Sequence, residues 1–221
     1  MNINDLGRSY TSQMRAIIRF PEAPWNDALS HGQVQSKAWI IEELLKAKKT
    51  KLGTTYILGG WLGVLGPLLL SETKLSIDKI RSFDIDPSCE RIADQLNVEH
   101  VIKEWKYKAI TKDMFEINYD THNYTIPVPG QNDAIAVESP DTIINTVCDH
   151  ISDFPKWWKL IPKGKLVILQ NNDFKHGSDK SHVNTIEKIE DMLEQCPMSR
   201  IVFDGFRDFT KYRRFMVIGV R

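Results

Sequence analysis

The spacing of hydrophobic positions changes near Gly53. From Gln33 to Lys48 apolar residues recur at roughly helical spacing, which predicts one amphipathic helix ended by a basic run. The first thirty residues are polar and irregular, and Pro21 and Pro24 indicate a loop. After Gly53, short β-branched or aromatic runs alternate with helical patterns. The sequence therefore predicts a helical N-terminal extension followed by an α/β core.

The predicted strands are runs rich in Val, Ile, Thr and aromatic residues, at 54–58, 80–85, 108–111, 142–147, 165–170, 200–203 and 214–220. Helical patterns separate most of them, at 62–70, 88–97, 154–160 and 182–195. Strands that alternate with helices imply crossover connections and a mainly parallel sheet with helices on both faces. The last two strands are joined by too short a connection for a helix, so we expect them to be antiparallel.

One segment departs from this alternation. Residues 115–140 are polar, rich in turn-forming residues and without a helical pattern. We interpret them as a hairpin plus a loop that covers the functional site.

Length and composition favour a single domain. The chain has 221 residues, 42% of them hydrophobic, which is enough for one sizeable core but not for two. We therefore expect one domain over 1–221, with an N-terminal loop and helix over 1–52 and the core over 53–221.

Charge and cysteine usage limit the partners. The chain carries 29 basic and 29 acidic residues, and this balance argues against non-specific nucleic-acid binding. Three well-separated cysteines fit reduced thiols better than disulfides or a zinc site, so no metal site is predicted. The longest apolar stretch, 61–70, is too short to cross a membrane, and no signal peptide is recognisable. These features predict a cytoplasmic protein, with no membrane segment, acting on a small molecule.

Ligands of an open parallel sheet bind outside the carboxyl ends of its strands. After the first predicted strand come Gly59, Gly60, Trp61 and Gly63, where glycines let backbone amides approach a ligand. After the second comes Asp86, at the spacing of an acid that accepts the hydroxyls of a ribose. Each signal has a simpler alternative: a packing turn for the glycines and a helix cap for Asp86.

The order of these features resembles the class I S-adenosylmethionine (SAM)-dependent methyltransferase family over 54–221. TTYILGGWLG is similar to its first motif, FDIDPSCERIADQLN to its second, and TKDMFE to its third. DTIINTVCDHISDFPKWWKLIPKGKLVILQ is similar to its fourth strand, the following acid–His pair, a helix and the turn into the fifth strand. The resemblance implies a seven-stranded, mostly parallel Rossmann-like sheet that ends in an antiparallel hairpin. It also implies SAM as cofactor.

The resemblance implies roles for individual residues. The cofactor would be bound by the glycine turn, by Lys37 and Asn145, by Asp86 at the ribose, and by Asp113 and Met114 near the adenine.

Three departures from the family pattern are clear. Leu58 stands near the place of the usual strand acid, and Leu62 replaces a glycine. The methionine end of SAM would then be held differently, or the ligand would not be SAM. The sequence also has no Asn-Pro-Pro-aromatic tetrapeptide after the fourth strand, which weighs against methylation of exocyclic amines in nucleic acids or of protein glutamine.

Candidate catalytic and substrate residues follow the later strands. His150 and Asp149 stand where a base for methyl transfer would be needed, although lining the cofactor pocket is the simpler role. Asn171, which ends the fifth strand, could orient a polar substrate. Arg213 and Arg214 belong to a cationic stretch that could hold a carboxylate or phosphate, or be a solvated turn.

The sequence thus predicts a SAM-dependent methyltransferase acting on a small-molecule or otherwise unidentified acceptor. One alternative keeps the cofactor but transfers another group or cleaves SAM, and the altered glycine turn supports it. Another is a non-catalytic partner subunit of the same fold. A nicotinamide-dependent oxidoreductase explains Gly60 and Asp86 but not the antiparallel terminal hairpin.

Overall fold

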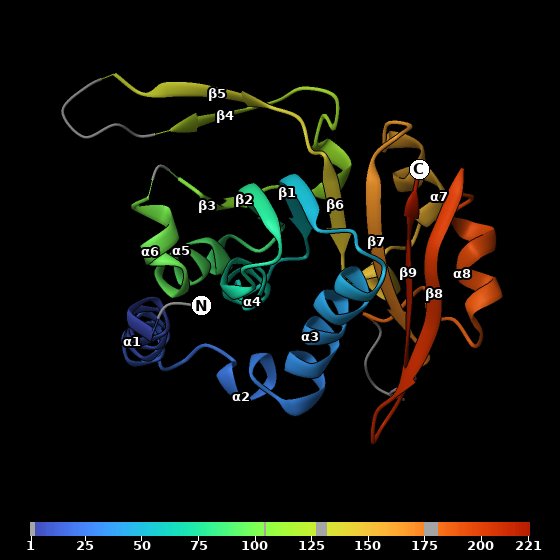
Figure 1. Cartoon of the computed structure of the whole chain (residues 1–221), viewed down its shortest axis with the longest axis horizontal. Helices are drawn as coiled ribbons and strands as arrows, with labels where there is room; N and C mark the ends of the chain where they lie inside the picture. The colour runs from blue at the N-terminus through green and yellow to red at the C-terminus, as the bar shows by residue number, and fades with distance from the viewer. Residues whose placement is uncertain (1–2, 104, 127–131, 175–180) are drawn as a thin grey trace.

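Seven strands form one sheet in the order β3-β2-β1-β6-β7-β9-β8 (Figure 1). The computed structural model describes residues 3–103, 105–126, 132–174 and 181–221. The five strands from β3 to β7 are parallel, and β9 runs antiparallel to both β7 and β8. The predicted parallel sheet with a terminal antiparallel hairpin is confirmed. The sheet strands are β1 (Lys51–Leu58), β2 (Ser76–Asp84), β3 (Tyr107–Thr111), β6 (Thr142–Asn145), β7 (Leu166–Asn172), β8 (Arg200–Asp208) and β9 (Arg213–Val220).

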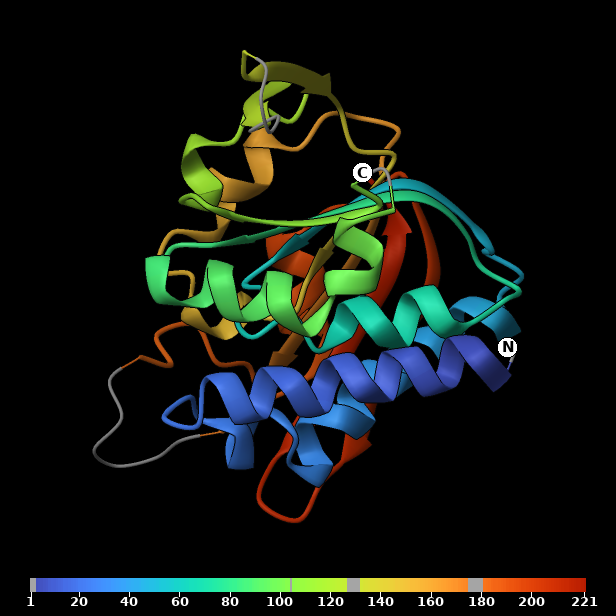
Figure 2. The same ribbon diagram turned by 90° about the vertical axis from the view of Figure 1, so that its left-hand side faces the viewer.

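Helices cover both faces of this sheet (Figures 1 and 2). The side chains of α3, α4 and α5 pack on one face, and those of α7 and α8 pack on the other. Neighbouring strand residues alternate between the two faces. Ile57 therefore packs with side chains of α3, α4 and α5, and Leu58 packs with side chains of α7 and α8. The helices are α2 (Trp25–Ala28), α3 (His31–Lys46), α4 (Leu65–Ser71), α5 (Pro87–Leu96), α6 (Val98–Val101), α7 (Phe154–Leu160) and α8 (Ile189–Gln195). Single 3-10 turns occur at Met114–Glu116 and Cys148–His150.

The N-terminal segment corrects the sequence prediction. Residues Ile3–Arg19 form a 17-residue helix, α1, where an irregular loop was expected. Figure 2 shows α1 lying alongside α5, outside the layer that touches the sheet. Its buried side includes Ser12 and Ala16, four residues apart. The sequence does carry a helical period here, because Tyr10, Met14 and Ile17 recur at four- and three-residue spacing, and the prediction overlooked it.

The polar segment at 115–140 contains the expected hairpin, of strands β4 (His122–Ile126) and β5 (Ala134–Glu138). Its predicted position over the site was wrong. The hairpin leads into the start of β6, and Glu138 binds Arg81 and Lys79, so the described part lies at the amino-terminal edge of the parallel strands (Figure 1).

The helix predicted at 182–195 is shorter than expected. Only Ile189–Gln195 is helical, and the residues from Ser181 to Lys188 precede it without regular structure. This difference matters because it places His182 on a loop beyond the carboxyl end of β7.

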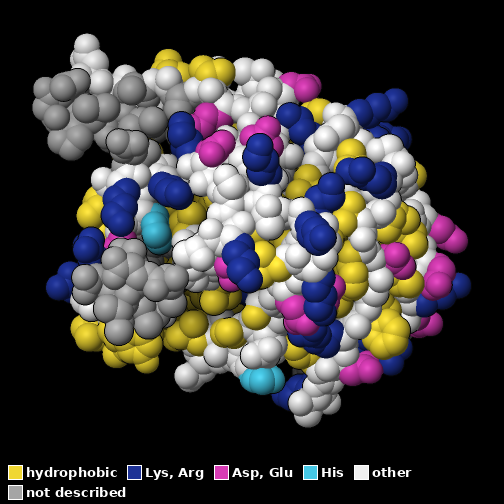
Figure 3. Space-filling view, viewed as in Figure 1, with side chains coloured by type: hydrophobic (Ala, Val, Ile, Leu, Met, Phe, Trp, Pro, Cys, Tyr) yellow, Lys and Arg dark blue, Asp and Glu magenta, His cyan; other side chains and the backbone are white. Residues whose placement is uncertain are grey.

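The surface agrees with the balanced charge. On the face shown in Figure 3, basic and acidic side chains are interspersed rather than gathered by sign. Among the described residues, no helix combines the length and apolar character needed to cross a membrane.

Candidate active site

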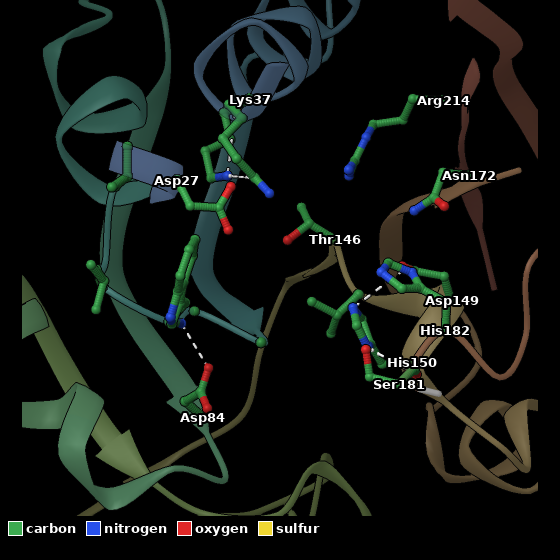
Figure 4. A pocket seen from close by; sticks show the side chains of 17 residues that line it. Asp27, Lys37, Asp84, Thr146, Asp149, His150, Asn172, Ser181, His182 and Arg214 are labelled. Carbon is green, nitrogen blue, oxygen red and sulfur yellow. Dashed lines mark hydrogen bonds and ion pairs between the residues drawn. The ribbon is translucent and has the colours of Figure 1, made fainter. Parts of the chain in front are cut away.

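A cavity of about 400 Å³ lies at the carboxyl edge of the parallel strands. Its wall is built by the segments that follow β1, β2, β6 and β7, with contributions from α3 and β9 (Figure 4). This is where an open α/β sheet binds its ligands. The residues that line it include Asp27, Lys37, Gly59, Gly60, Asp84, Asp149, His150, Asn172, His182 and Arg214.

The glycine turn after β1 is shaped by two close approaches. Gly59 has φ of +64°, a conformation that side chains disfavour, and a Cβ there would overlap Val147. A Cβ on Gly60 would overlap the hydroxyl of Ser82. Gly59, Gly60 and Trp61 all line the cavity, as predicted. Gly63 does not line it, because its backbone packs against Tyr107 and accepts a hydrogen bond from Asn97.

The two acids after β2 have different positions. The Asp84 carboxylate lines the cavity and accepts hydrogen bonds from the backbone N–H groups of Trp61 at 2.7 Å and Asp86 at 3.0 Å. Asp86, the acid singled out from the sequence, is exposed and does not line this cavity. Its carboxylate caps α5 by accepting from the N–H of Ser88, a bond that lowers the pKa of Asp86.

A further cavity of about 380 Å³ adjoins the first beyond Asp84. Asp113 and Met114, predicted near an adenine, line it together with Ile85 and Phe115. The two cavities share four residues, namely Gly59, Asp84, Val147 and His150. Asp84 therefore stands at the junction between an apolar pocket and the more polar central cavity.

A cavity of about 510 Å³ adjoins the central one on its other side. Asn172, His182 and Arg214 line both. Its outer wall is aromatic, formed by Phe174, Phe209 and Tyr212, with the start of α3 opposite. Three neighbouring cavities thus form a continuous row along the carboxyl edge of the sheet.

Asp149 and two histidines form a cluster on one wall of the central cavity (Figure 4). Asp149 is only 2% exposed, and its Oδ2 lies 2.5 Å from Nδ1 of His182 and 3.3 Å from Nε2 of His150. Nδ1 of His150 lies 3.0 Å from the carbonyl oxygen of Ser181. A carbonyl only accepts hydrogen bonds, so this contact places the ring proton of neutral His150 on Nδ1.

Two basic side chains line the cavity: Lys37 from α3 lies across it from this cluster, and Arg214 from β9 lies on the same side as Asn172 (Figure 4). Burial, together with the nearby Arg214 charge, lowers the pKa of Lys37 to about 7. Arg214 is 6% exposed, its buried Nε has no hydrogen-bond partner, and its guanidinium lies over the Tyr212 ring. Both side chains were predicted to bind ligands, and both line the cavity.

Three other predicted residues make structural contacts instead. Asn145 is fully buried, where it accepts from the N–H of Val147. The Asn171 side chain bonds to the backbone, so its neighbour Asn172 is the asparagine that lines the cavity. Arg213 pairs with Asp208 and stacks on Phe206, away from the three cavities.

Sequence reasoning missed Asp84 and His182. The predicted second strand ran to residue 85, whereas β2 ends at Asp84, so the acid at the strand terminus is the earlier one. His182 was assigned to a helix. The structure places it in the irregular segment from Ser181 to Lys188, and the neighbouring Ser181 and Asn184 are residues typical of loops.

Comparison with solved structures identifies the fold. Magnesium protoporphyrin IX methyltransferase (ChlM) from Synechocystis PCC 6803 with bound SAM superimposes with a TM-score of 0.57, at 16% identity over 86% of this chain and 80% of that one. N-methyltransferase NodS from Bradyrhizobium japonicum WM9 gives 0.56, at 11% identity over 86% and 96% of the two chains. The chain has the class I SAM-dependent methyltransferase fold.

The extent of this likeness is clear from a second NodS structure. In its complex with S-adenosylhomocysteine, NodS matches 96% of this chain and 98% of its own length, with a TM-score of 0.53 and 10% identity. No protein-family model matches the sequence, and the search of curated proteins gave no match either. The methyltransferase fold therefore rests on the structural likeness, and it covers most of the chain.

Proposed function

We propose that this protein is a SAM-dependent methyltransferase that acts on a small molecule. The observation that carries the proposal is the row of three cavities along the carboxyl edge of a methyltransferase-fold sheet, with Asp84 at the first junction and Arg214 at the second. Each cavity lies within the range of about 300–1,000 Å³ that small-molecule sites occupy.

The residues present fit SAM. The apolar pocket beside Met114 suits an adenine, and Asp84 stands where it can accept the ribose hydroxyls. The glycine turn leaves room for the ligand against the backbone, and Lys37 is placed to pair with the carboxylate of the methionine end. SAM would supply a methyl group on a sulfonium centre. We assign the ribose role to Asp84 rather than Asp86, because Asp86 faces solvent and caps α5.

The chain's own contribution to methyl transfer is to position the acceptor and take up its proton. The Asp149–His150–His182 cluster lies opposite Lys37, so an acceptor that enters from the aromatic cavity would meet it (Figure 4). The unpaired buried Nε of Arg214, between the two cavities, favours an acceptor that carries an anionic group.

The test uses two acids that are two residues apart. The variant Asp84→Asn should weaken binding of S-adenosylhomocysteine by roughly 10- to 100-fold, the value of a hydrogen bond to a charged group. Asp86→Asn should leave the affinity unchanged, and because asparagine caps helices as well as aspartate it should also leave stability unchanged. Calorimetric titration measures the affinities, and thermal unfolding without ligand controls for folding.

Three other results are informative. Loss of affinity in Asp86→Asn alone would return the ribose role to that residue. Equal affinity in both variants and the parent would show that neither Asp84 nor Asp86 binds the ligand. If SAM is turned over to a product other than S-adenosylhomocysteine, the reaction is a different transfer or a cleavage, which the altered glycine turn would then explain.

A further inference from the structure

Asp149, His150 and His182 converge from two separate loops. Asp149 and His150 belong to the 3-10 turn after β6, and His182 belongs to the loop after β7. One ligand atom from each, a carboxylate oxygen and two ring nitrogens, lies within 4.8 Å of the other two. Two histidines and one carboxylate are a donor set that proteins use for transition metals.

The distances suit an ion. Two ligands held at about 2.0–2.1 Å from a tetrahedral ion are about 3.3–3.4 Å apart. Oδ2 of Asp149 and Nε2 of His150 are 3.3 Å apart. Oδ2 of Asp149 and Nδ1 of His182 are 2.5 Å apart, the distance of a short hydrogen bond between the carboxylate and the imidazole. An ion would replace the proton of this bond and widen the separation.

The surroundings hold the ligands as a metal site requires. Histidine ligands usually donate their other ring N–H to a carbonyl or carboxylate, and His150 does so to the carbonyl of Ser181. Asn184 joins the two loops, because its N–H donates to the Asp149 carbonyl and its side chain donates to the Cys148 carbonyl. Phe174 packs against the His182 ring. The cluster is therefore oriented before any ion binds.

We propose that Asp149, His150 and His182 bind one divalent transition-metal ion, such as Zn²⁺, Fe²⁺ or Mn²⁺. Three protein ligands leave at least one coordination position open, and all three residues line the central cavity. An acceptor with an oxygen or nitrogen donor would occupy that position. The ion would orient the acceptor and lower the pKa of its donor group. Ion binding does not depend on SAM, so this proposal stands apart from the proposed function.

Cobalt is the probe, because Co²⁺ in a nitrogen and oxygen site absorbs visible light. The full chain, without a histidine tag, is stripped with a chelator, dialysed and titrated with Co²⁺. We expect one Co²⁺ per chain, visible bands that Zn²⁺ bleaches, and a higher melting temperature with either ion.

Two variants and a control make the test specific. Substitutions of residues that only support metal ligands typically weaken metal binding by roughly 10- to 100-fold. His182→Gln and His150→Ala each remove a ligand, so each should weaken Co²⁺ binding by more than that. The His150 side chain is 40% exposed, so His150→Ala should fold even if the other variant does not. His31→Ala removes an exposed histidine at the aromatic cavity and should bind Co²⁺ like the parent.

The proposal is overturned if the parent binds no Co²⁺, or if His150→Ala binds it as the parent does. A parallel titration with S-adenosylhomocysteine after chelator treatment separates the two hypotheses. Binding of that ligand without any Co²⁺ binding would reject the metal site and leave the proposed function intact. Co²⁺ binding without binding of S-adenosylhomocysteine would support the metal site and count against the proposed function.

Discussion

Two buried arginines at opposite edges of the sheet differ in their partners. Arg81, 1% exposed, donates from Nε and Nη2 to the two carboxylate oxygens of Glu138 at 2.9 and 2.8 Å, and from Nη1 to two backbone carbonyls. Arg214 is almost equally buried, but its Nε has no partner. A paired buried charge belongs to the structure of the fold, whereas an unpaired one at a cavity is suited to an anionic ligand.

The same contrast separates the two clusters of polar residues. At the amino-terminal edge, Glu138 joins the β4–β5 hairpin to β2 through Arg81 and Lys79. At the carboxyl edge, Lys37 and Arg214 line the cavity, and neither forms an ion pair with a carboxylate of the described residues (Figure 4). The first cluster should therefore control stability and the second should control binding.

The largest effect is expected at Glu138. In Glu138→Gln the buried Arg81 loses the negative charge of the Glu138 carboxylate, and breaking one side of a buried pair costs about 3–5 kcal/mol. Urea unfolding measures this loss. Glu42→Gln is the matched control, because Glu42 also binds two cations, Lys46 and Arg207, but at the surface, where such pairs contribute about 0–1 kcal/mol. Equal losses in the two variants would contradict the comparison.

A pH effect of intermediate size is expected at Lys37. Its pKa of about 7 means that the free protein loses this positive charge as the pH rises above 7, whereas a bound carboxylate favours the charged form. The affinity for S-adenosylhomocysteine should therefore fall with rising pH above 7, by at most about tenfold, or 1.4 kcal/mol, per unit. Titrations between pH 7 and pH 8.5 measure the slope.

The control for that slope is Lys37→Met, which removes the contribution of this side chain and keeps that of every other group. Proton uptake on binding, seen as a dependence of the heat on the buffer, should likewise disappear in this variant. A parent and a variant with the same slope would show that Lys37 does not meet the ligand's carboxylate.

The smallest change in stability is expected at Arg214. Replacing it by leucine removes a buried cation whose Nε is unpaired, so the free energy of unfolding should stay within about 1 kcal/mol of the parent or increase. S-adenosylhomocysteine should bind Arg214→Leu as tightly as the parent, because we place Arg214 on the acceptor side. A loss of more than about 3 kcal/mol, as expected at Glu138, would make Arg214 a structural residue.

The mainly parallel sheet and its terminal antiparallel hairpin could be predicted, because strand runs alternate with helices and end in two adjacent runs. Helix α1 was predictable in the same way but was overlooked, because Tyr10, Met14 and Ile17 recur at helical spacing. The position of the β4–β5 hairpin depends on the pairing of Glu138 with Arg81, residues 57 apart, which no local pattern contains.

The site was predictable only in part. The glycine turn, His150 and Arg214 follow from their places relative to the strands, whereas Lys37 was implied by the family resemblance. The choice between Asp84 and Asp86 depends on where β2 ends, and a strand end cannot be located to one residue from its composition. The contact of His182 with Asp149, 33 residues earlier, depends on the loop after β7, and a helix was predicted there.

The central claim is that the cavity row at the carboxyl edge binds SAM, and one calorimetric titration tests it most directly. The unaltered chain is titrated at pH 7 with SAM and, separately, with S-adenosylhomocysteine. We expect one bound ligand per chain in each case, with dissociation constants between about 1 μM and 1 mM, the range in which enzymes commonly bind substrates. The absence of binding by both ligands would contradict the account and leave a methyltransferase fold whose cavity serves a different molecule.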